Sequence, residues 1–409
     1  MRSVTSSVKA LEEREAPSWL RRARSRIGIV KRAIYFDNAG AGPLSSDVRR
    51  AAIEFLELWD REGEPWEVAL EHIVEARALF AKFVGATKDQ VAAVPNVSTG
   101  LNALLSSLEL KGEANAVASP LNFPTGIFAL HALRQRGLLR EVRLAQRRGG
   151  AVGLEEYERL IDDQTRIVLV DYVSWITGFR EHIRELAGLA HAHGARLIVD
   201  AFHLVGVMPL DVARDGIDAL LCGAYKWLLG LHGAAFVYLA RELLEGLRPM
   251  LAGWHSIADS VIDRMARREE VFARSFDISD YKRAEDAKVL EWGTWPAIAF
   301  EGTLAALKML EAFEVPQRYD GHTYRLTEEL LEGLEGLGLR VLTPRERRAA
   351  IVCFEFRDSH VLVRKLRERG IIVSARPGLI RVSPHFYNTE QEVHAFLEVL
   401  AQELKSLRQ

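Results

Sequence analysis

Short hydrophobic runs alternate with longer amphipathic stretches along most of the chain. The runs Val91–Pro95, Arg166–Tyr172, Arg196–Asp200 and Ala219–Cys222 are rich in apolar residues and lack strict alternation. Such runs are typical of strands that helices cover on both faces. Amphipathic stretches such as Ile183–His193 lie between them and predict helices. Strands separated by helices favour right-handed crossovers, so the pattern predicts an α/β fold with a mainly parallel sheet.

The N-terminal third shows the same alternation of predicted strands and helices. Ile34–Asp37 reads as a short strand, and Asp47–Trp59 reads as a helix. Ser45 or Ser46 is the expected N-cap of this helix, because serine oxygens accept hydrogen bonds from the free N–H groups of a first turn. After Asn96–Gly100, a further apolar helical pattern begins at Leu101.

The pattern changes near Pro296, where the spacing of strands and helices becomes irregular. The predicted order is two helices, two strands, a helix, two more strands and a final helix, over Ala297–Phe313, Tyr324–Leu337, Arg340–Leu342, Ile351–Phe356, Val361–Arg369, Ile371–Ser374, Leu379–Val382 and Glu390–Leu407. We therefore expect three regions: a helical segment at 1–33 that packs on the small domain, a large α/β domain at 34–296, and a small C-terminal α+β domain at 297–409.

Composition narrows the class of protein. The 409 residues are 48% hydrophobic and 27% charged, as expected for a globular protein with a substantial core. The net charge of −2 predicts no nucleic-acid partner. With only two cysteines, Cys222 and Cys353, a disulfide framework is excluded. No apolar run reaches the roughly 20 residues that a membrane span needs. Acidic residues (Glu12, Glu13 and Glu15) precede the arginines at 21–26 and argue against a transit peptide, so we expect a solvated leading helix and a cytoplasmic protein.

One glycine-rich segment resembles a dinucleotide fingerprint. The segment at 40–45 reads GAGPLS, and it follows a predicted strand and precedes a helix. Its third small position is Ser45, and the acid at the right distance, Asp60, falls in a helical stretch rather than at the end of a strand. Nucleotide binding is therefore disfavoured.

Asp200 and Lys226 form a stronger candidate pair. Asp200 ends an apolar strand, at the edge where ligands bind in open α/β sheets. Lys226 follows another apolar strand between Tyr225 and Trp227. A lysine in apolar surroundings has a lowered pKa, and its neutral amine can form a Schiff base with an aldehyde cofactor. Each residue alone also fits a plainer interpretation, a loop cap for Asp200 and a solvent-reaching side chain for Lys226.

Seven segments in order resemble the class V aminotransferases, which use pyridoxal phosphate (PLP). They are spread over residues 34–400, roughly the range of the match, and read IYFDNAGAGP, PNVSTGLN, LNFPTG, RLIVDAFHLVGVMPLDV, CGAYKWLLG, WGTWP and IRVSPHFYNTEQEV. The group includes cysteine desulfurases, selenocysteine lyases, isopenicillin N epimerase-like proteins and kynureninases. The resemblance implies a fold-type I PLP enzyme.

The resemblance assigns a role to each matching residue. Lys226 matches the Schiff-base lysine, Asp200 the partner of the pyridine nitrogen, and His203 the position near the phenolic oxygen of the cofactor. Phosphate contacts are implied for Ser98 and Thr99, in a turn that opens a helix, and for Tyr225. Phe123 matches the aromatic residue that stacks on the cofactor ring. Thr294 resembles a residue that reaches the phosphate of the neighbouring subunit, which implies a homodimer with shared active sites.

Substrate contacts are implied mainly by one arginine. Arg381 matches the residue that binds the α-carboxylate of the substrate, a role that suits a planar, permanently charged guanidinium. Trp175, Arg180, Trp254 and His255 fall where the family has active-site loops, and they are weaker candidates for the substrate pocket. No metal site is expected, because His191 and His193 do not share a helix face.

The pocket decides which reaction follows. Cysteine desulfurases carry a nucleophilic cysteine on a loop shortly before the carboxylate-binding arginine, whereas residues 374–379 here read SARPGL. Persulfide-forming desulfuration is therefore disfavoured. The first expectation is an aminotransferase-like enzyme acting on a small-molecule α-amino acid. A lyase that cleaves C–S, C–Se or C–C bonds comes second, epimerisation third, and a PLP-binding protein without turnover last.

Overall fold

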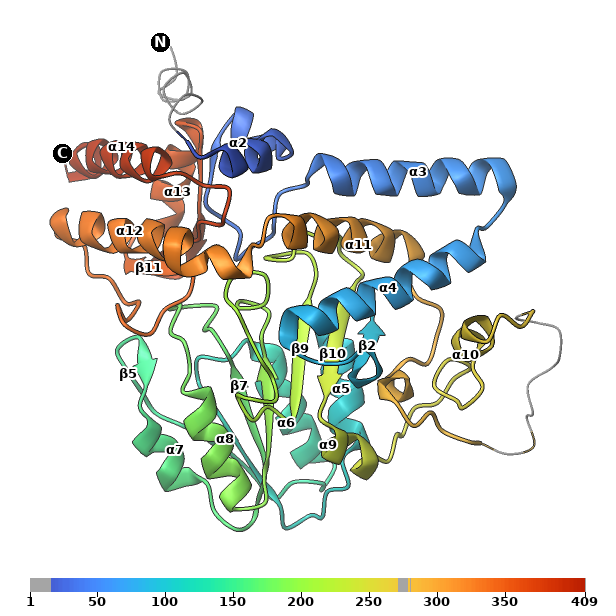
Figure 1. The fold of residues 1–409 in the computed structure, drawn as a ribbon. Helices are drawn as coiled ribbons and strands as arrows, with labels where there is room; N and C mark the ends of the chain where they lie inside the picture. The colour runs from blue at the N-terminus through green and yellow to red at the C-terminus, as the bar shows by residue number, and fades with distance from the viewer. Residues whose placement is uncertain (1–15, 271–278, 280, 409) are drawn as a thin grey trace.

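The computed structural model describes residues 16–270, 279 and 281–408, and its centre is a seven-stranded sheet (Figure 1). The strand order is β2-β10-β9-β8-β7-β3-β4. All neighbours pair in parallel except β10, which is antiparallel to both β2 and β9. The strands are β2 (Val91–Val94), β3 (Asn115–Ala118), β4 (Glu141–Leu144), β7 (Thr165–Asp171), β8 (Arg196–Asp200), β9 (Ala219–Gly223) and β10 (Ala235–Leu239). The predicted α/β class with a mainly parallel sheet is confirmed.

Helices cover both faces of this sheet. The helices α4 (Trp66–Val84), α7 (Leu154–Leu160) and α8 (Ile183–Ala192) contribute to the core on one face, and α5 (Val97–Ser107), α6 (Pro124–Gln135) and α9 (Arg241–Gly246) contribute to the core on the other. Along β9, Leu220 and Cys222 belong to the first core and Ala219 and Leu221 to the second. Side chains of both pleats are therefore buried, which explains the absence of alternation in the sequence.

Three helices are stacked on one another at the side of the sheet near β2, and the innermost, α4, packs against β2 (Figure 1). Helix α11 (Ala297–Ala312) packs against α3 (Ser46–Glu62) and α4. The N-cap of α3 is Ser45, one of the two predicted caps, and its side chain accepts a hydrogen bond from the N–H of Val48 over 3.2 Å. Short elements complete this part of the chain: η1 (Gly28–Lys31), η2 (Lys88–Gln90), α10 (Val261–Ala266), η3 (Ala287–Leu290) and the hairpin of β5 (Arg147–Arg148) and β6 (Ala151–Val152).

The small domain is built on a three-stranded antiparallel sheet, in the order β11-β14-β13. A separate parallel pair joins β1 to β12. The elements of the small domain are β1 (Ile34–Tyr35), η4 (Pro316–Arg318), η5 (Tyr319–Thr323), α12 (Tyr324–Gly336), β11 (Val352–Glu355), α13 (Ser359–Glu368), β12 (Ile371–Ile372), β13 (Ser374–Arg376), β14 (Leu379–Val382) and α14 (Glu390–Arg408). Its apolar core includes Phe36, Phe354 and Phe396.

The packing differs from the predicted domain boundaries at two places. Strand β1 pairs with β12, and Ile34 and Phe36 lie in the core of the small domain. Helix α11, assigned by sequence to the small domain, supplies Phe300 and Leu304 to the core of the large domain. We propose that the boundary lies after α11 and that β1 belongs to the small domain. Long-range pairing decides this, and local patterns do not report it.

The leading segment contacts both parts of the molecule. Helix α2 (Ser18–Ser25) carries Arg24, which donates hydrogen bonds to the carbonyl oxygen of Tyr387 at 2.9 Å and to Glu392 at 3.0 Å. Ala23 and Ile27 join the core of the large domain. One face of the predicted solvated helix is therefore buried. Residues 1–15, including the three glutamates, lie outside the described residues.

Three further local expectations can be checked. Arg340–Leu342 does not form the predicted strand, because only a single bridge links Val341 to Phe354 before the chain turns at Pro344. Helix α5 begins at Val97, four residues before the predicted start, because Asn96 caps it. Nowhere in the described ranges is a helix both long and apolar enough to cross a membrane.

Candidate active site

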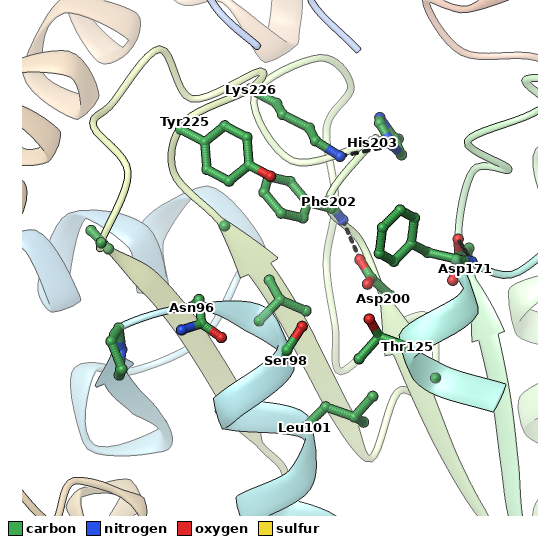
Figure 2. Close-up of a pocket in the computed structure, with 17 residues that line it drawn as sticks. Asn96, Ser98, Leu101, Thr125, Asp171, Asp200, Phe202, His203, Tyr225 and Lys226 are labelled. Carbon is green, nitrogen blue, oxygen red and sulfur yellow. Dashed lines mark hydrogen bonds between the residues drawn. The ribbon is translucent and has the colours of Figure 1, made fainter. Parts of the chain in front are cut away.

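The principal candidate is a pocket at the carboxyl ends of β7, β8 and β9, facing the first turns of α5 and α6 (Figure 2). Its lining includes Ser98, Phe123, Asp171, Asp200, His203 and Lys226. Figure 2 shows Lys226 and Tyr225 entering from the loop after β9, and Asp200 and His203 from the end of β8. The edge is the one at which open α/β sheets bind ligands.

Lys226 is held by a tight loop. The N–H of Leu229 donates to the carbonyl oxygen of Lys226 over 3.1 Å, and Leu229 has a φ of 56°, a strained conformation for a branched residue. Gly42 packs on the other side, where an added Cβ would lie 2.2 Å from the same carbonyl oxygen. The glycine-rich segment that resembles a nucleotide fingerprint therefore serves as a backbone contact behind Lys226.

The amine of Lys226 lies in a poorly solvated position. The residue is 8% exposed, and Nζ is 4.2 Å from the centroid of the Phe202 ring. Burial lowers the pKa of Lys226 to about 8, an effect that the negative charge of Asp200 opposes and the positive charge of Arg381 reinforces. A substantial fraction of neutral amine is therefore present near pH 8, as a nucleophile or proton acceptor requires.

His203 connects Lys226 to the interior. Its Nε2 is 3.3 Å from Nζ of Lys226, and its Nδ1 accepts a hydrogen bond from the indole N–H of Trp227 over 3.0 Å. An indole N–H can only donate, so Nδ1 is unprotonated and the neutral ring carries its proton on Nε2. Burial, with the charge of Lys226, lowers the pKa of His203 well below its usual value. His203 therefore directs an N–H toward the neutral form of Lys226.

Two carboxyl groups lie side by side at the floor of the site. Asp171 and Asp200 are register partners at the ends of β7 and β8. Burial raises the pKa of both, and the charge of Asp200 raises that of Asp171 further. Asp200 accepts a hydrogen bond from the N–H of Phe202 at 2.9 Å, and Asp171 accepts one from the N–H of Phe123 at 2.7 Å. Asp171 is consequently the acid that retains a proton more readily.

The first turn of α5 forms a side of the pocket that is suited to binding an anion. Ser98 lines the pocket, whereas Thr99 does not, and the N–H of Thr99 is already bound to the cap, Asn96, at 2.8 Å. The preceding N–H groups of the turn and the helix dipole favour a dianion such as phosphate. Tyr225 also lines the pocket, and its ring stacks on His232 with a centroid separation of 4.0 Å.

Aromatic rings surround the amine. Phe123 remains 42% exposed at the edge of the pocket, so its ring has a free face, and Nζ of Lys226 is 5.8 Å from its centroid. Trp175 stands edge-on to Phe123 at 5.4 Å. Sequence reasoning named Phe123 but missed Phe202, whose ring centroid is closer to Nζ of Lys226 than that of Phe123 or Tyr225.

Arg381 is close to the pocket without lining it. The side chain is 1% exposed and donates to the carbonyl oxygen of Trp175 over 2.8 Å and to the hydroxyl of Ser374 over 3.3 Å. Its Nη2 has no hydrogen-bond partner and is 3.7 Å from Asp37. One end of the guanidinium thus lacks a hydrogen bond, although its charge lies near Asp37.

The remaining predicted residues lie outside this pocket. Thr294 is exposed on a loop. His255 is fully buried between the rings of Trp254 and Trp295, and both its nitrogens lack a hydrogen-bond partner. Arg180 pairs through its backbone with Arg347. The single chain does not bring these residues to Lys226.

Both cysteines are buried away from any loop that could deliver a nucleophile. Cys222 lies in β9 and Cys353 in β11. Burial raises the pKa of Cys353 to about 12 and that of Cys222 well above its usual value. Thiols in this state are poor nucleophiles.

Asp171, Phe202 and Asn96 are pocket residues that the sequence reasoning missed. Asp171 had a usable signal, because it occupies the end of a predicted buried strand as Asp200 does. Asn96 is an N-cap residue before an apolar helical pattern. Phe202 had no such signal, since its position depends on the turn after β8.

Known proteins resemble this chain over nearly its whole length. The family model for class V aminotransferases matches residues 34–396. An uncharacterized aminotransferase, YcbU, of Bacillus subtilis strain 168 is 29% identical over 362 residues, covering 88% of this chain and 91% of that protein. A kynureninase of Shouchella clausii is 24% identical and covers 95% and 92%.

Solved structures share the fold. The apo cysteine desulfurase of Thermococcus onnurineus NA1 superposes with a TM-score of 0.81 at 23% identity, covering 94% of this chain and 98% of that one. A mutant of the enzyme C-DES with glycine covalently linked to its PLP cofactor gives a TM-score of 0.82 at 22% identity and covers 92% and 98%. The fold is that of the fold-type I PLP enzymes, and with its family model matched from residue 34 to residue 396 the chain belongs to the class V aminotransferases, a family of PLP-dependent enzymes.

Proposed function

We propose that the protein is an aminotransferase-like enzyme that uses Lys226 to hold PLP and to move the Cα proton of a small α-amino acid. The observation that carries this proposal is the position of the Lys226 amine. It is buried, has a pKa lowered to about 8, contacts His203 at 3.3 Å and shares a pocket with Asp200. An amine in this state is suited both to bonding an aldehyde and to accepting a proton.

The pocket fits a PLP molecule on the chemistry of its walls. It offers an amine for the aldehyde, the half-buried carboxyl group of Asp200 for the ring nitrogen, and an exposed aromatic face in Phe123. The first turn of α5, with Ser98, offers N–H groups and a hydroxyl for the phosphate. Tyr225 adds a second hydroxyl on the same side as Lys226.

Bound PLP supplies an electron sink that stabilises negative charge at the substrate Cα. The chain supplies the remaining parts. Asp200, half-buried and beside Asp171, would hold a proton on the ring nitrogen through its own negative charge. Lys226 accepts the Cα proton and returns it, because its lowered pKa makes both protonation states accessible near neutral pH. His203 orients the lysine amine with its Nε2 proton.

Arg381 is proposed to bind the α-carboxylate of the substrate. Its unpartnered Nη2 and its position on a rigid strand suit a bidentate contact with a carboxylate. We also propose a homodimer with shared sites, in which exposed Thr294 reaches the phosphate bound by the partner. A cytoplasmic location and the absence of nucleic-acid partners complete the proposal.

A lyase is the second candidate. The segments with Phe123 and Tyr225 resemble those of kynureninases, and several relatives bear that name. Persulfide-forming desulfuration is less favoured, because Cys353 and Cys222 are buried with raised pKa values. Epimerisation ranks third, and binding without turnover ranks last, since binding alone needs no carboxylate-binding arginine.

The test of the central proposal replaces Lys226. Purified wild-type protein is expected to be yellow after addition of PLP, and borohydride should remove the visible band and leave a permanent adduct on Lys226 by peptide mass spectrometry. Lys226→Ala should show neither the band nor the adduct. Lys308→Ala, on the surface of α11, should behave as wild type. A colourless wild type that cannot be loaded with PLP would refute the proposal.

The reaction class is separated by a panel of α-amino acids. Transamination predicts release of a keto acid with conversion of the cofactor to its amine form, whereas a lyase predicts release of sulfide, selenide or alanine. An epimerase predicts exchange of the Cα proton with loss of optical activity and no keto acid. If the wild-type enzyme releases no more keto acid than the Lys226→Ala variant, transamination is excluded.

A further inference from the structure

Two arginines project from the same face of the small-domain sheet. In the pairing of β13 with β14, Ser374 is opposite Arg381 and Arg376 is opposite Leu379. Residues two apart on a strand lie on the same face, so Arg376 and Arg381 share a face with Ser374. Ile380, on the other face, belongs to the core of the small domain. The two guanidinium groups therefore leave the small domain in the direction of the large one.

The side chains of Arg376 and Arg381 both contact Trp175 of the large domain. Arg381 donates to the carbonyl oxygen of Trp175 at 2.8 Å, and the guanidinium carbon of Arg376 is 5.5 Å from the centroid of the Trp175 ring. The same ring meets Phe123 edge-on at 5.4 Å. Arg376 and Arg381 thus reach the edge of the PLP pocket through one shared neighbour. Consistently, the charges of both arginines lower the pKa values of Lys226 and His203.

Each guanidinium has a buried nitrogen without a hydrogen-bond partner. The atoms are Nε of Arg376 and Nη2 of Arg381. Buried donors are nearly always satisfied in folded proteins, and an unsatisfied charged donor is costlier than a neutral one. Two such atoms on adjacent side chains indicate a place that is completed by a ligand.

Positive charge exceeds negative charge at this place. Asp37, 3.7 Å from Arg381, is the nearby acid. Within the described residues Arg376 forms no ion pair, and its Nη1 donates only to the carbonyl oxygen of Ala375 at 2.7 Å. One incoming carboxylate on Arg381 would leave Arg376 without an anion. A buried cation and a half-buried cation, of which only Arg381 has an acid nearby, favour a ligand with two negative groups.

We propose that the substrate is an α-amino acid with a second anionic group on its side chain, bound by Arg376 while Arg381 binds the α-carboxylate. The inference rests on the proposed function, in which Arg381 is the carboxylate site. The second group can be any compact oxyanion, such as a carboxylate or a sulfinate, because the guanidinium recognises its charge and paired oxygens. Arg376 then acts as a specificity-determining residue.

The experiment measures binding to the PLP-loaded enzyme by titration calorimetry, with unreactive acids that lack the amino group. Succinate and glutarate are the dianionic probes, and butyrate and valerate are the monoanionic controls of equal length. The dianions are expected to bind at least about tenfold more tightly to the wild type, which corresponds to about 1.4 kcal/mol. Arg376→Gln should remove this preference and leave monoanion binding unchanged. Arg340→Gln, on the exposed surface of the same domain, should keep the preference.

A second pair of measurements connects binding to the substrate. Aspartate and glutamate should perturb the visible spectrum of the enzyme at concentrations at least about tenfold lower than asparagine and glutamine. Arg376→Lys keeps the positive charge but lacks the paired N–H donors of a guanidinium, so it should retain part of the preference for dianions. Equal affinity of the wild-type enzyme for dianions and monoanions would overturn the inference. This comparison needs no variant, so it holds even if a variant fails to fold.

Two further outcomes also count against it. If Arg376→Gln weakens the binding of dianions and monoanions equally, Arg376 belongs to the α-carboxylate site or supports the fold. If the variant changes the affinity for neither class, Arg376 does not bind the ligand. Failure of the proposed function looks different, since it removes the visible PLP spectrum and its dependence on Lys226. A yellow enzyme with no preference for dianions would overturn only the inference on Arg376.

Discussion

The indole N–H of Trp227 points at Nδ1 of His203, 3.0 Å away, and so determines which nitrogen of that histidine carries the proton. Trp227 is fully buried, and its carbonyl oxygen accepts a hydrogen bond from Nε2 of His385 at 2.9 Å. The chain of contacts continues from His203 to Lys226 at 3.3 Å. The residue that follows the lysine thus helps to orient it.

Trp227→Phe is expected to keep the fold and the PLP content but to release His203 from its single tautomer. Loss of one hydrogen bond of about 1 kcal/mol predicts a fall in kcat of about fivefold with little change in KM. The pH profile of kcat should change as well, because His203 becomes easier to protonate. Steady-state kinetics across pH provide the measurement. Trp59→Phe on the exposed surface of α3 is the control, and an unchanged pH profile in Trp227→Phe would refute the role.

Lys226 should destabilise the apoenzyme at neutral pH. Its usual pKa of 10.5 falls to about 8 in the folded chain, so the unfolded chain binds more protons between these values and stability rises with pH there. Below pH 8 the full cost of burying the charge is present, on the order of 3 kcal/mol. Lys226→Met apoenzyme should be more stable than wild type at pH 7 by up to this amount.

The advantage of Lys226→Met should shrink as the pH rises from 8 toward 10.5. Urea unfolding of PLP-free protein at equal concentrations would measure it. Lys308→Met, at a surface ion pair, should show no comparable pH-dependent gain. A gain that stays constant with pH would point to packing instead of charge.

Arg381→Ala should separate substrate binding from cofactor binding. Loss of a charged, bidentate contact predicts an increase in KM of about 100-fold, or about 3 kcal/mol. The visible band of the bound cofactor should be retained, because Arg381 does not line the pocket around Lys226. Arg340→Ala serves as the matched surface control. Loss of the PLP band in Arg381→Ala would contradict the assigned role.

Gly42→Ala should disturb the site through the backbone. The added Cβ would be 2.2 Å from the carbonyl oxygen of Lys226 and 2.6 Å from the side chain of Leu229. Overpacking of this kind costs about 2 kcal/mol and should displace the lysine loop, so thermal stability and PLP affinity are both expected to fall. At Gly28 an added Cβ meets nothing within 4 Å, which makes Gly28→Ala the control. Equal PLP affinities in the two variants would contradict the predicted displacement.

Much of the large domain could be predicted because its strands and helices are encoded locally. The runs that end at Asp200 and Cys222 form β8 and β9 within one residue of the expected bounds. Ordered motifs around Lys226 indicated the family for the same reason, since each motif is a short contiguous segment. Strands without alternation also indicated that both faces of the sheet are covered.

Other features depend on contacts between distant segments, which a local pattern does not report. The chain order does not reveal that β1 pairs with β12, or that the register of β7 and β8 sets Asp171 beside Asp200. The same holds for Arg376, whose place next to Arg381 follows from the turn between β13 and β14. The sequence by itself determined the fold class and the family, and with the family its cofactor, and it singled out Lys226 as the candidate lysine. Only the tertiary structure decided the proton on His203, the second acid and the second cation, because register and packing set which side chains meet.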